Sequence, residues 1–418
     1  MEKSAEFLVE RFPRARRALR IAVVTETYAP EVNGVALSAA RFVEGLRRRE
    51  HEIQLVRPRQ DQESSDRASG MHDALGQDIL TQGVPIPRYP GLRLGLPETR
   101  ALVHLWRRNR PDVVHVLTEG PLGWSAVSAA RKLKLPVISD FRTNFHSYSR
   151  HYGIGWLSKP ILAYLRKFHN RTLCTLVPTE AMRAELAVLG FRDLRVVSRG
   201  VDTALFDPAR RSEALRASWG VGPSDTVLLH VGRIAPEKNL AALVSAYEAA
   251  RVQEPRSRLV LIGDGPAKAE VQARCPDAIF AGTRRGEDLA IHYASADVFL
   301  FPSLTETYGN VTLEALASGL AVVAFDYAAA AETIRQGDNG LLAPMGDVAA
   351  FATLAASAVS DIARARAMGS RARESALKLG WDLVVRQLET LLEVAASVAP
   401  LYNTTGRQPA VNSLSRSS

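Results

Sequence analysis

Short runs of apolar residues alternate with helical stretches along this chain, and the alternation occurs twice. Residues 21–24 in the first half and 259–262 in the second contain only Ala, Val, Leu and Ile. Strands without polar alternation are buried on both faces, which is typical of parallel sheets covered by helices. The repeated order of strand and helix therefore predicts two doubly wound α/β domains with Rossmann-like sheets.

The expected strands of the first half are 21–24, 53–56, 113–116 and 137–139, and those of the second half are 227–231, 259–262, 278–281, 298–301 and 321–324. Ligands of such sheets bind at the carboxyl ends of the strands. We therefore expect a ligand in the cleft between the two sheets.

The length of 418 residues also favours two domains, because it exceeds what one core usually supports. We expect a first domain over 20–200 and a second over 201–380, joined by a hinge at 199–202. A basic leader occupies 1–19, and residues 59–82 are expected to form a flexible loop. A last helix is expected over 381–400, followed by a disordered polar tail over 401–418.

Positive charge is concentrated in the first half. Residues 1–200 contain 32 Lys and Arg against 20 Asp and Glu, whereas residues 201–418 contain 21 against 24. Such a split indicates an anionic partner of the first domain, namely nucleic acid, an anionic membrane or a phosphorylated substrate, unless the source proteome is basic throughout. With only two cysteines and no apolar run of about 18 residues, we expect a cytoplasmic protein.

The segment 301–314 carries two glutamates, Glu306 and Glu314, separated by the turn Gly309-Asn310. The turn places Glu306 on a loop and Glu314 in a helix whose first N–H groups are free to bind phosphate. Carboxylates can accept hydrogen bonds from sugar hydroxyls, so the segment fits a nucleotide sugar. Alternatively, Glu306 is an ordinary surface residue and Glu314 a helix-capping one.

A second segment, Gly232-Arg233 with Lys238, follows an expected strand of the same half. Two cations at the carboxyl end of a sheet can neutralise a diphosphate, and Gly232 permits close approach of the backbone. The alternative is a solvated basic loop. Together with the glutamate pair, this segment predicts one nucleotide-sugar pocket in the second domain.

The first half offers two further loops. Gly34 lies in a loop that opens a helix after the first strand, although the Gly-x-Gly-x-x-Gly dinucleotide fingerprint is absent. Asp140, Arg142 and His146 lie on one loop, where they could bind sugar hydroxyls or move a proton. Alternatively, the polar groups of this loop satisfy each other.

Aromatic and basic residues mix in three segments, 155–168, 92–96 and 105–108. Such segments can lie on an anionic membrane, or they can be core helices with a basic outer face. We also expect no metal cofactor, because no Asp-x-Asp pair occurs and the histidines lack zinc-site spacing. No residue is evident as a covalent nucleophile.

These segments together resemble the retaining glycosyltransferases of family 4, which have the GT-B fold, over about residues 20–395. The resemblance implies that Arg233 and Lys238 hold the donor diphosphate, that Glu306 contacts the donor sugar and that Gly34 lines the phosphate. It implies that Glu314 binds the ribose and that the last helix crosses back onto the first domain. The expected donor-binding residues are Gly34, Gly232, Arg233, Lys238, Glu306, Tyr308, Gly309, Asn310, Val311 and Glu314.

Within that family the segment 305–319 is most similar to GDP-mannose-dependent α-mannosyltransferases and to enzymes that glycosylate diacylglycerol from UDP-sugars. The resemblance implies a hexosyltransferase whose acceptor is a lipid or glycan, with peripheral association at the inner face of the membrane. Many members have a histidine in place of Arg142. Either His146 takes the role of that histidine or Arg142 does different work, such as pairing with glucuronate, so the expected catalytic residues are Glu306, His146 and Arg142.

Two other classes are disfavoured. A nucleic-acid-binding protein would explain the basic half, but no nucleic-acid-binding module is present and the basic residues are scattered. A nicotinamide-dependent oxidoreductase would suit two Rossmann-like sheets, but the glycine fingerprint is missing.

Overall fold

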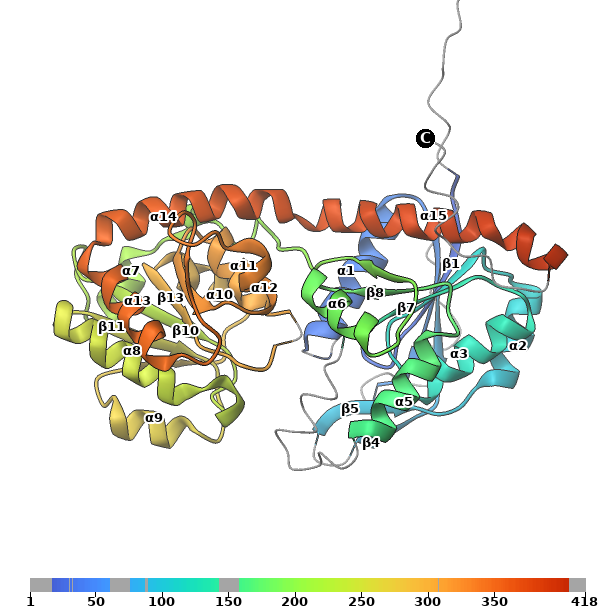
Figure 1. Cartoon of the computed structure of the whole chain (residues 1–418), viewed down its shortest axis with the longest axis horizontal. Helices are drawn as coiled ribbons and strands as arrows, with labels where there is room; N and C mark the ends of the chain where they lie inside the picture. The colour runs from blue at the N-terminus through green and yellow to red at the C-terminus, as the bar shows by residue number, and fades with distance from the viewer. Residues whose placement is uncertain are drawn as a thin grey trace, which may run out of the picture.

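A computed structural model describes residues 17–29, 31, 33–60, 76–86, 89–142, 158–306 and 308–405. These residues form two α/β domains that lie side by side, each built on its own parallel sheet (Figure 1). The predicted architecture of two doubly wound domains is therefore confirmed. Within the described residues, every strand expected from the sequence is present, with its ends shifted by three residues at most.

The first domain is built on a seven-stranded sheet with strand order β3-β2-β1-β6-β7-β8-β9. Its strands are β1 (Arg20–Val24), β2 (Glu52–Pro58), β3 (Gly76–Thr81), β6 (Val113–Val116), β7 (Val137–Asp140), β8 (Cys174–Val177) and β9 (Leu194–Val196), and β4 (Gly83–Ile86) with β5 (Tyr89–Gly95) forms a separate antiparallel hairpin. Its helices are α1 (Gly34–Arg48), α2 (Thr99–Arg108), α3 (Pro121–Lys132), α5 (Ser158–His169) and α6 (Glu180–Val188).

The second domain is built on a six-stranded parallel sheet with strand order β12-β11-β10-β13-β14-β15. Its strands are β10 (Val227–Val231), β11 (Arg258–Ile262), β12 (Ile279–Gly282), β13 (Val298–Phe301), β14 (Ala321–Phe325) and β15 (Leu341–Ala343). Its helices are η3 (Pro208–Arg210), α7 (Glu213–Ser218), η4 (Pro236–Lys238), α8 (Leu240–Gln253), α9 (Lys268–Arg274), α10 (Gly286–Ala294), α11 (Asn310–Ala317), α12 (Ala328–Thr333), α13 (Val348–Ser360), α14 (Ile362–Ala376) and η5 (Leu377–Leu379).

Helices cover both faces of each sheet, and buried apolar side chains form two clusters in the second domain and three in the first. The central strands β10 and β13 are buried along their whole length, and β1 is buried except at Arg20, because these strands carry almost only apolar side chains. This burial is the main favourable term in the folding of each domain. It also fixes the carboxyl ends of the strands, from which the loops of the candidate site project.

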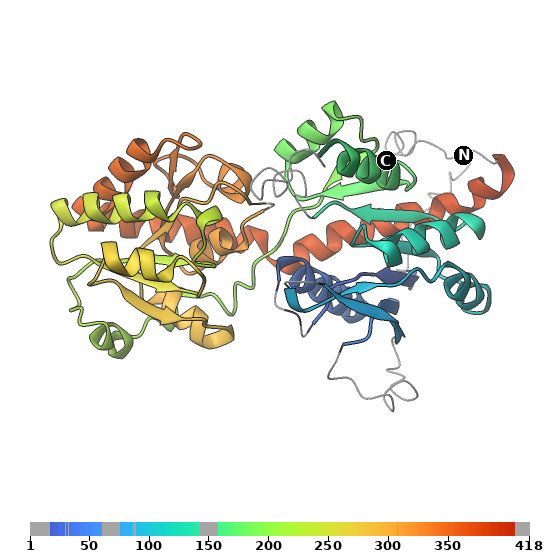
Figure 2. The same cartoon turned by 90° about the horizontal axis from the view of Figure 1, so that it is seen from below.

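The chain passes between the domains twice, and the two passages lie side by side (Figure 2). Val201 N–H donates to Leu379 O at 3.0 Å, and a Cβ at Gly200 would come within 2.8 Å of the Trp381 backbone. Trp381 begins the long helix α15 (Trp381–Thr405), and its ring meets Phe42 edge-on at 5.9 Å. The two passages therefore form a close-packed hinge.

Helix α15 packs against the first domain although it follows the second in sequence (Figure 1). Val385 approaches Gly45 of α1 so closely that a Cβ there would lie 2.5 Å from the valine side chain. A buried charge fixes the same contact: Glu389 accepts hydrogen bonds from Arg49 at 2.6 Å and from His51 at 3.0 Å. Burial alone would raise the pKa of Glu389, but these hydrogen bonds outweigh it and lower the pKa below its ordinary value.

Two expectations need correction. Residues 76–81 of the expected loop form edge strand β3, whose polar sequence gave no strand signal. Helix α15 continues to Thr405, so the tail expected from 401 is wrong over 401–405. For the segment 105–108 the alternative of a core helix holds, because Trp106 is fully buried in the core of the first domain.

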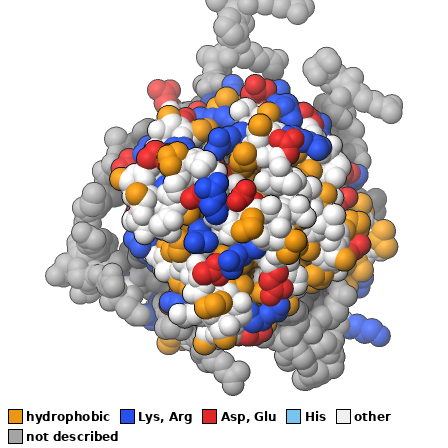
Figure 3. All heavy atoms as spheres, turned by 90° about the vertical axis from the view of Figure 1, so that its left-hand side faces the viewer, with side chains coloured by type: hydrophobic (Ala, Val, Ile, Leu, Met, Phe, Trp, Pro, Cys, Tyr) orange, Lys and Arg blue, Asp and Glu red, His pale blue; other side chains and the backbone are white. Residues whose placement is uncertain are grey.

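The surface at the outer end of the second domain is neither predominantly hydrophobic nor predominantly of one charge (Figure 3). Figure 3 shows Lys and Arg interspersed with Asp and Glu over this face, in keeping with the near-neutral charge of residues 201–418. Among the described residues, no single helix has the length and apolar character needed to cross a membrane; one sharply bent pair, Val348–Ser360 with Ile362–Leu379, meets those criteria.

The contact of α15 with the first domain predicts a stability effect. Replacing Glu389 with Gln should destabilise the first domain by about 2–3 kcal/mol, because Arg49 and His51 lose a charged acceptor. Thermal unfolding followed by circular dichroism measures this, and Glu393→Gln on the same helix serves as the control. The difference in unfolding free energy between wild type and variant should have its full size above the unfolded-state pKa of about 4.5. It should decrease as the pH falls below that value, because Glu389 becomes protonated. Equal midpoints at pH 7 would contradict the role of Glu389.

Candidate active site

Helix α11 begins with an open N-terminus after the loop that follows β13. Gly309 precedes it with φ of +96°, a left-handed conformation that favours glycine, and no side chain caps the helix. The first N–H groups of the helix are therefore available to an anion. Tyr308 is almost fully buried, and its hydroxyl donates to Arg199 O at 3.3 Å, so its ring packs under the turn. Burial raises the pKa of Tyr308 to about 12.

Glu306 lies on the loop between β13 and α11, as the sequence predicts. Its carboxylate accepts hydrogen bonds from the Lys238 ammonium and from Ser303 Oγ, the latter at 2.7 Å. Tyr327 donates to the Glu306 backbone carbonyl at 3.0 Å. The side chain is only 16% exposed. Lys238 and Ser303 thus hold the carboxylate at the carboxyl end of β13, and Tyr327 fixes the backbone of the same residue.

Glu314 lies in the second turn of α11. The Tyr293 hydroxyl donates to its Oε2 at 3.0 Å. Burial raises the pKa of Glu314 to about 7, and the hydrogen bond from Tyr293 lowers it only in part. This carboxyl group therefore changes its protonation state near neutral pH, unlike an exposed glutamate.

The loop after β10 carries the two predicted phosphate-binding cations. Arg233 is half exposed and pairs with Glu237 of η4. Burial would raise the pKa of Glu237, but Arg233 outweighs it and lowers the pKa. Gly232 lies so close to the loop after β11 that its carbonyl oxygen would be 1.9 Å from a Cβ at Gly263. The structure thus brings Lys238 to Glu306 and leaves the Arg233 side chain accessible at the cleft.

The N-terminus of α1 in the first domain faces this group of residues. Asn33 caps α1 by accepting from Val35 N at 3.0 Å and from Ala36 N at 2.8 Å. A Cβ at Gly34 would lie 2.7 Å from Arg199 Nη1 and 3.7 Å from the Asn310 side chain. A side chain at this position would displace the Arg199 guanidinium, so the glycine lets Arg199 lie between helices α1 and α11.

Arg142 lies away from solvent. Its Nε donates to Asp140 Oδ2 at 2.5 Å, and His115 Nε2 donates to the other oxygen at 2.8 Å. Burial would raise the pKa of Asp140, but Arg142 and His115 outweigh it and lower the pKa. The alternative in which these loop groups satisfy each other thus holds for Asp140 and Arg142. His146 lies outside the described residues, so the catalytic roles of Arg142 and His146 remain predictions.

Sequence reasoning missed the residues that support the two glutamates. Ser303, Tyr293 and Tyr327 each bind one of them, yet only Ser303 is near its partner in sequence. The sequence assigned Arg199 only to the hinge. Its positive charge directly before Gly200 is the signal that could have indicated a role in the site. Among the described residues, no group of three or more His, Cys, Asp or Glu side chains could hold a metal ion.

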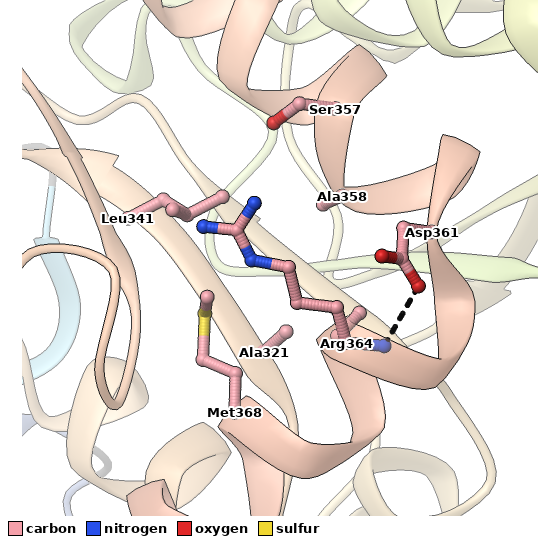
Figure 4. Close-up of a pocket in the computed structure, with 8 residues that line it drawn as sticks. Ala321, Leu341, Ser357, Ala358, Asp361, Arg364 and Met368 are labelled. Carbon is pink, nitrogen blue, oxygen red and sulfur yellow. Dashed lines mark hydrogen bonds between the residues drawn. The ribbon is translucent and has the colours of Figure 1, made fainter.

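A separate small pocket lies between α13, α14 and the edge of the second sheet (Figure 4). Leu341, Ala358 and Met368 are among the residues that line it, and Arg364 reaches across it. Because β14 and β15 contribute their first residues, Ala321 and Leu341, the pocket lies at the amino ends of these strands and is separate from the carboxyl-end loops. It has no part in the site above.

Comparison with known proteins places these features in a family. Residues 32–205 match the profile described as Glycosyltransferase Family 4, and residues 225–361 match the profile described as Glycosyl transferases group 1. A GDP-mannose-dependent alpha-mannosyltransferase of Mycobacterium tuberculosis is 35% identical over 374 residues, which cover 88% of this chain and 95% of that one. The chain belongs to glycosyltransferase family 4.

More distant relatives of this glycosyltransferase act on other substrates. Sulfoquinovosyl transferase of Arabidopsis thaliana is 33% identical over 72% of this chain and 60% of its own. Alpha-monoglucosyldiacylglycerol synthase of Streptococcus pneumoniae is 28% identical over 73% of this chain and 71% of its own. The glycosyltransferase shares its fold with the sucrose-phosphate synthase of Thermosynechococcus elongatus, with a TM-score of 0.70, 21% identity, and coverage of 90% and 98% of the two chains.

The raised pKa of Glu314 predicts how the stability of this glycosyltransferase depends on pH. Because the folded-state pKa of about 7 exceeds the unfolded value near 4.5, ionising Glu314 weakens folding as the pH rises through that interval. Glu314→Gln should therefore lose less stability than wild type between pH 5 and pH 8. Melting temperatures of the two proteins across this range measure the difference.

Only the difference between the pH profiles of wild type and Glu314→Gln reports on Glu314. Burial also raises the pKa of Glu26 in the first domain to about 7, so Glu26 titrates over the same range. Glu26 is present in both proteins, so its effect cancels. Parallel pH profiles for wild type and Glu314→Gln would show that Glu314 has an ordinary pKa.

Proposed function

We propose that this glycosyltransferase moves mannose from GDP-mannose to a lipid or glycan acceptor with retention of the α configuration. The observation that carries the proposal is the 35% identity to a GDP-mannose-dependent alpha-mannosyltransferase, which extends over 88% of the chain and thus over both domains. The geometry of the cleft agrees, because it places cations, an open helix N-terminus and two carboxylates at the carboxyl ends of strands.

The donor diphosphate would bind Arg233, Lys238 and the first N–H groups of α11. Lys238 now pairs with Glu306 and Arg233 with Glu237, so both cations are held in place before the donor arrives. The Glu306 carboxylate would accept a hydrogen bond from a hydroxyl of the transferred sugar. Glu314 would accept the ribose hydroxyls, with Tyr293 orienting it.

In this proposal the bond from the anomeric carbon to the distal phosphate oxygen breaks while the acceptor oxygen bonds to the same face. The proton of the acceptor hydroxyl passes to the departing phosphate oxygen, so no protein nucleophile is needed. Preorganised donors around that phosphate stabilise the charge that develops as the bond breaks. A trapped glycosyl-enzyme adduct would contradict this front-face mechanism.

A second candidate is transfer from a UDP-sugar to diacylglycerol. It is favoured by the 28% identity to an alpha-monoglucosyldiacylglycerol synthase over 73% of this chain. The two candidates use the same diphosphate site and differ in the base and the sugar. We propose further that no metal ion takes part, because the cations Arg233 and Lys238 can neutralise the diphosphate themselves.

Thermal-shift measurements with GDP, UDP and ADP test the donor and its cations together. A ligand that binds the folded protein alone raises the melting temperature, and we expect GDP to raise it most. Arg233→Gln should abolish most of this shift and lower turnover about 100-fold or more. Arg285→Gln, an exposed position on another loop, should behave as wild type.

In the same assays, EDTA should leave the turnover of the wild-type enzyme unchanged. A larger shift with UDP than with GDP would select the second candidate. Full activity in Arg233→Gln would refute the assignment of the diphosphate site.

Helix α5 supports a peripheral membrane contact by the first domain. Lys159 and Lys167 are exposed on it, and Tyr164 between them is 42% exposed. A cationic face with an exposed aromatic side chain suits an anionic bilayer surface, where each lysine contributes about 1 kcal/mol. We propose that α5 lies against the membrane that holds the acceptor.

Sedimentation with anionic phospholipid vesicles at low salt tests this contact. The double variant Lys159→Glu/Lys167→Glu should bind at least about tenfold more weakly, and binding of wild type should fall as salt is added. Lys268→Glu in the second domain serves as the control. If the double variant sediments as well as wild type, α5 is not the contact.

A further inference from the structure

Arg199 is a buried cation without an anionic partner. Its residue is 5% exposed, and among the described residues no carboxylate lies within ion-pair distance of it. Its Nη1 donates to Asn310 Oδ1 at 3.2 Å, while Nε is buried and has no hydrogen-bond partner. Burial, together with the neighbouring charge of Arg142, lowers the pKa of Arg199 to about 10.

A buried arginine with a structural role in the same protein shows a different pattern. Arg216 is fully buried, pairs with Asp297 at 3.1 Å and donates to the carbonyls of Ser295, Gly222 and Asp225 at 2.9, 3.0 and 2.6 Å. Arg199 makes one side-chain hydrogen bond instead. An unpaired buried charge is strongly unfavourable, so the arrangement around Arg199 is incomplete without an anion.

Other groups around Arg199 also favour an anion. Helix α1, of 15 residues, and helix α11, of 8, both begin beside it, and α11 has no side-chain cap. The positive ends of both helix dipoles therefore face the same guanidinium. Arg142 adds a second buried guanidinium whose Nη1 has no partner, although Asp140 neutralises its charge.

The space next to Arg199 belongs to both domains. Gly34 allows the guanidinium to lie against α1, since a Cβ there would be 2.7 Å from Nη1, and Asn310 brings it to α11. Arg199 itself lies on the hinge, two residues before Val201, whose N–H donates to Leu379 O. An anion held here would contact both domains and the hinge at once.

We propose that Arg199 binds the distal phosphate of the donor, the phosphate that leaves with the nucleotide, from the first-domain side of the cleft. The inference rests on the proposed function and adds a residue to it, opposite Arg233 and Lys238 of the second domain. A guanidinium can bind two phosphate oxygens at once, and its Nε–H is free to do so. Arg199 then stabilises the charge that develops on this phosphate as the sugar departs.

The test compares nucleotides that differ only in the distal phosphate. Calorimetric titration of wild type and Arg199→Gln with GDP and GMP, and with UDP and UMP, measures the effect of that phosphate. We expect Arg199→Gln to bind the diphosphate about 10- to 100-fold more weakly and the monophosphate within about twofold of wild type. Arg199→Lys, which keeps the charge, should recover part of the loss. Arg192→Gln, at an exposed position seven residues away, is the matched control.

A second readout separates ligand binding from a structural role. Removing an unpaired buried charge should leave the melting temperature of the nucleotide-free protein unchanged or raise it. A lower melting temperature together with equal losses for diphosphate and monophosphate would overturn the proposal. Unchanged diphosphate affinity in both Arg199 variants would also overturn it. Failure of wild type to bind either diphosphate would overturn the proposed function as well.

Discussion

Positive potential accumulates where the two domains present the carboxyl ends of their strands, and the rest of the site is arranged around it. Helices α1 and α11 point their N-termini at one another with Arg199 between them. Lys238 and Arg233 lie on the loop after β10. These helix N-termini and cations repel one another in the protein without a ligand. A bound anion turns the repulsion into attraction. The fold supplies these groups from two parallel sheets whose central strands are buried and hydrogen-bonded to one another.

The carboxylates in the cleft complement this potential. Glu306 is tied to Lys238 and Ser303, and Glu237 is tied to Arg233, so an acid positions each cation. Glu314 lies in α11, and burial raises its pKa to about 7. A diphosphate flanked by sugars needs both kinds of group: the segment after β10 offers the cations for the phosphates, and α11 with its preceding loop offers the acceptors for the hydroxyls.

The sequence predicted what depends on local pattern. Aliphatic strands such as 21–24 gave the two sheets, and Gly309 gave the start of α11, because burial and positive φ leave strong local signals. Edge strand β3 was missed because its polar residues carry no such signal. Tyr293 and Arg199 were missed because their roles come from contacts across 21 and 111 positions of sequence, to Glu314 and Asn310. The pairing of Arg142 with Asp140 was foreseen as an alternative because the two are close in sequence, but the contact of His115 with Asp140 spans 25 positions and was missed.

A crystal structure of the wild-type protein with GDP-mannose is the most direct test of this arrangement. We expect the diphosphate between Gly34 and Asn310, within hydrogen-bond distance of Arg199, Arg233 and Lys238, with the mannose beside Glu306. A diphosphate bound elsewhere, or one that contacts the second domain alone and leaves Arg199 without a ligand, would contradict it.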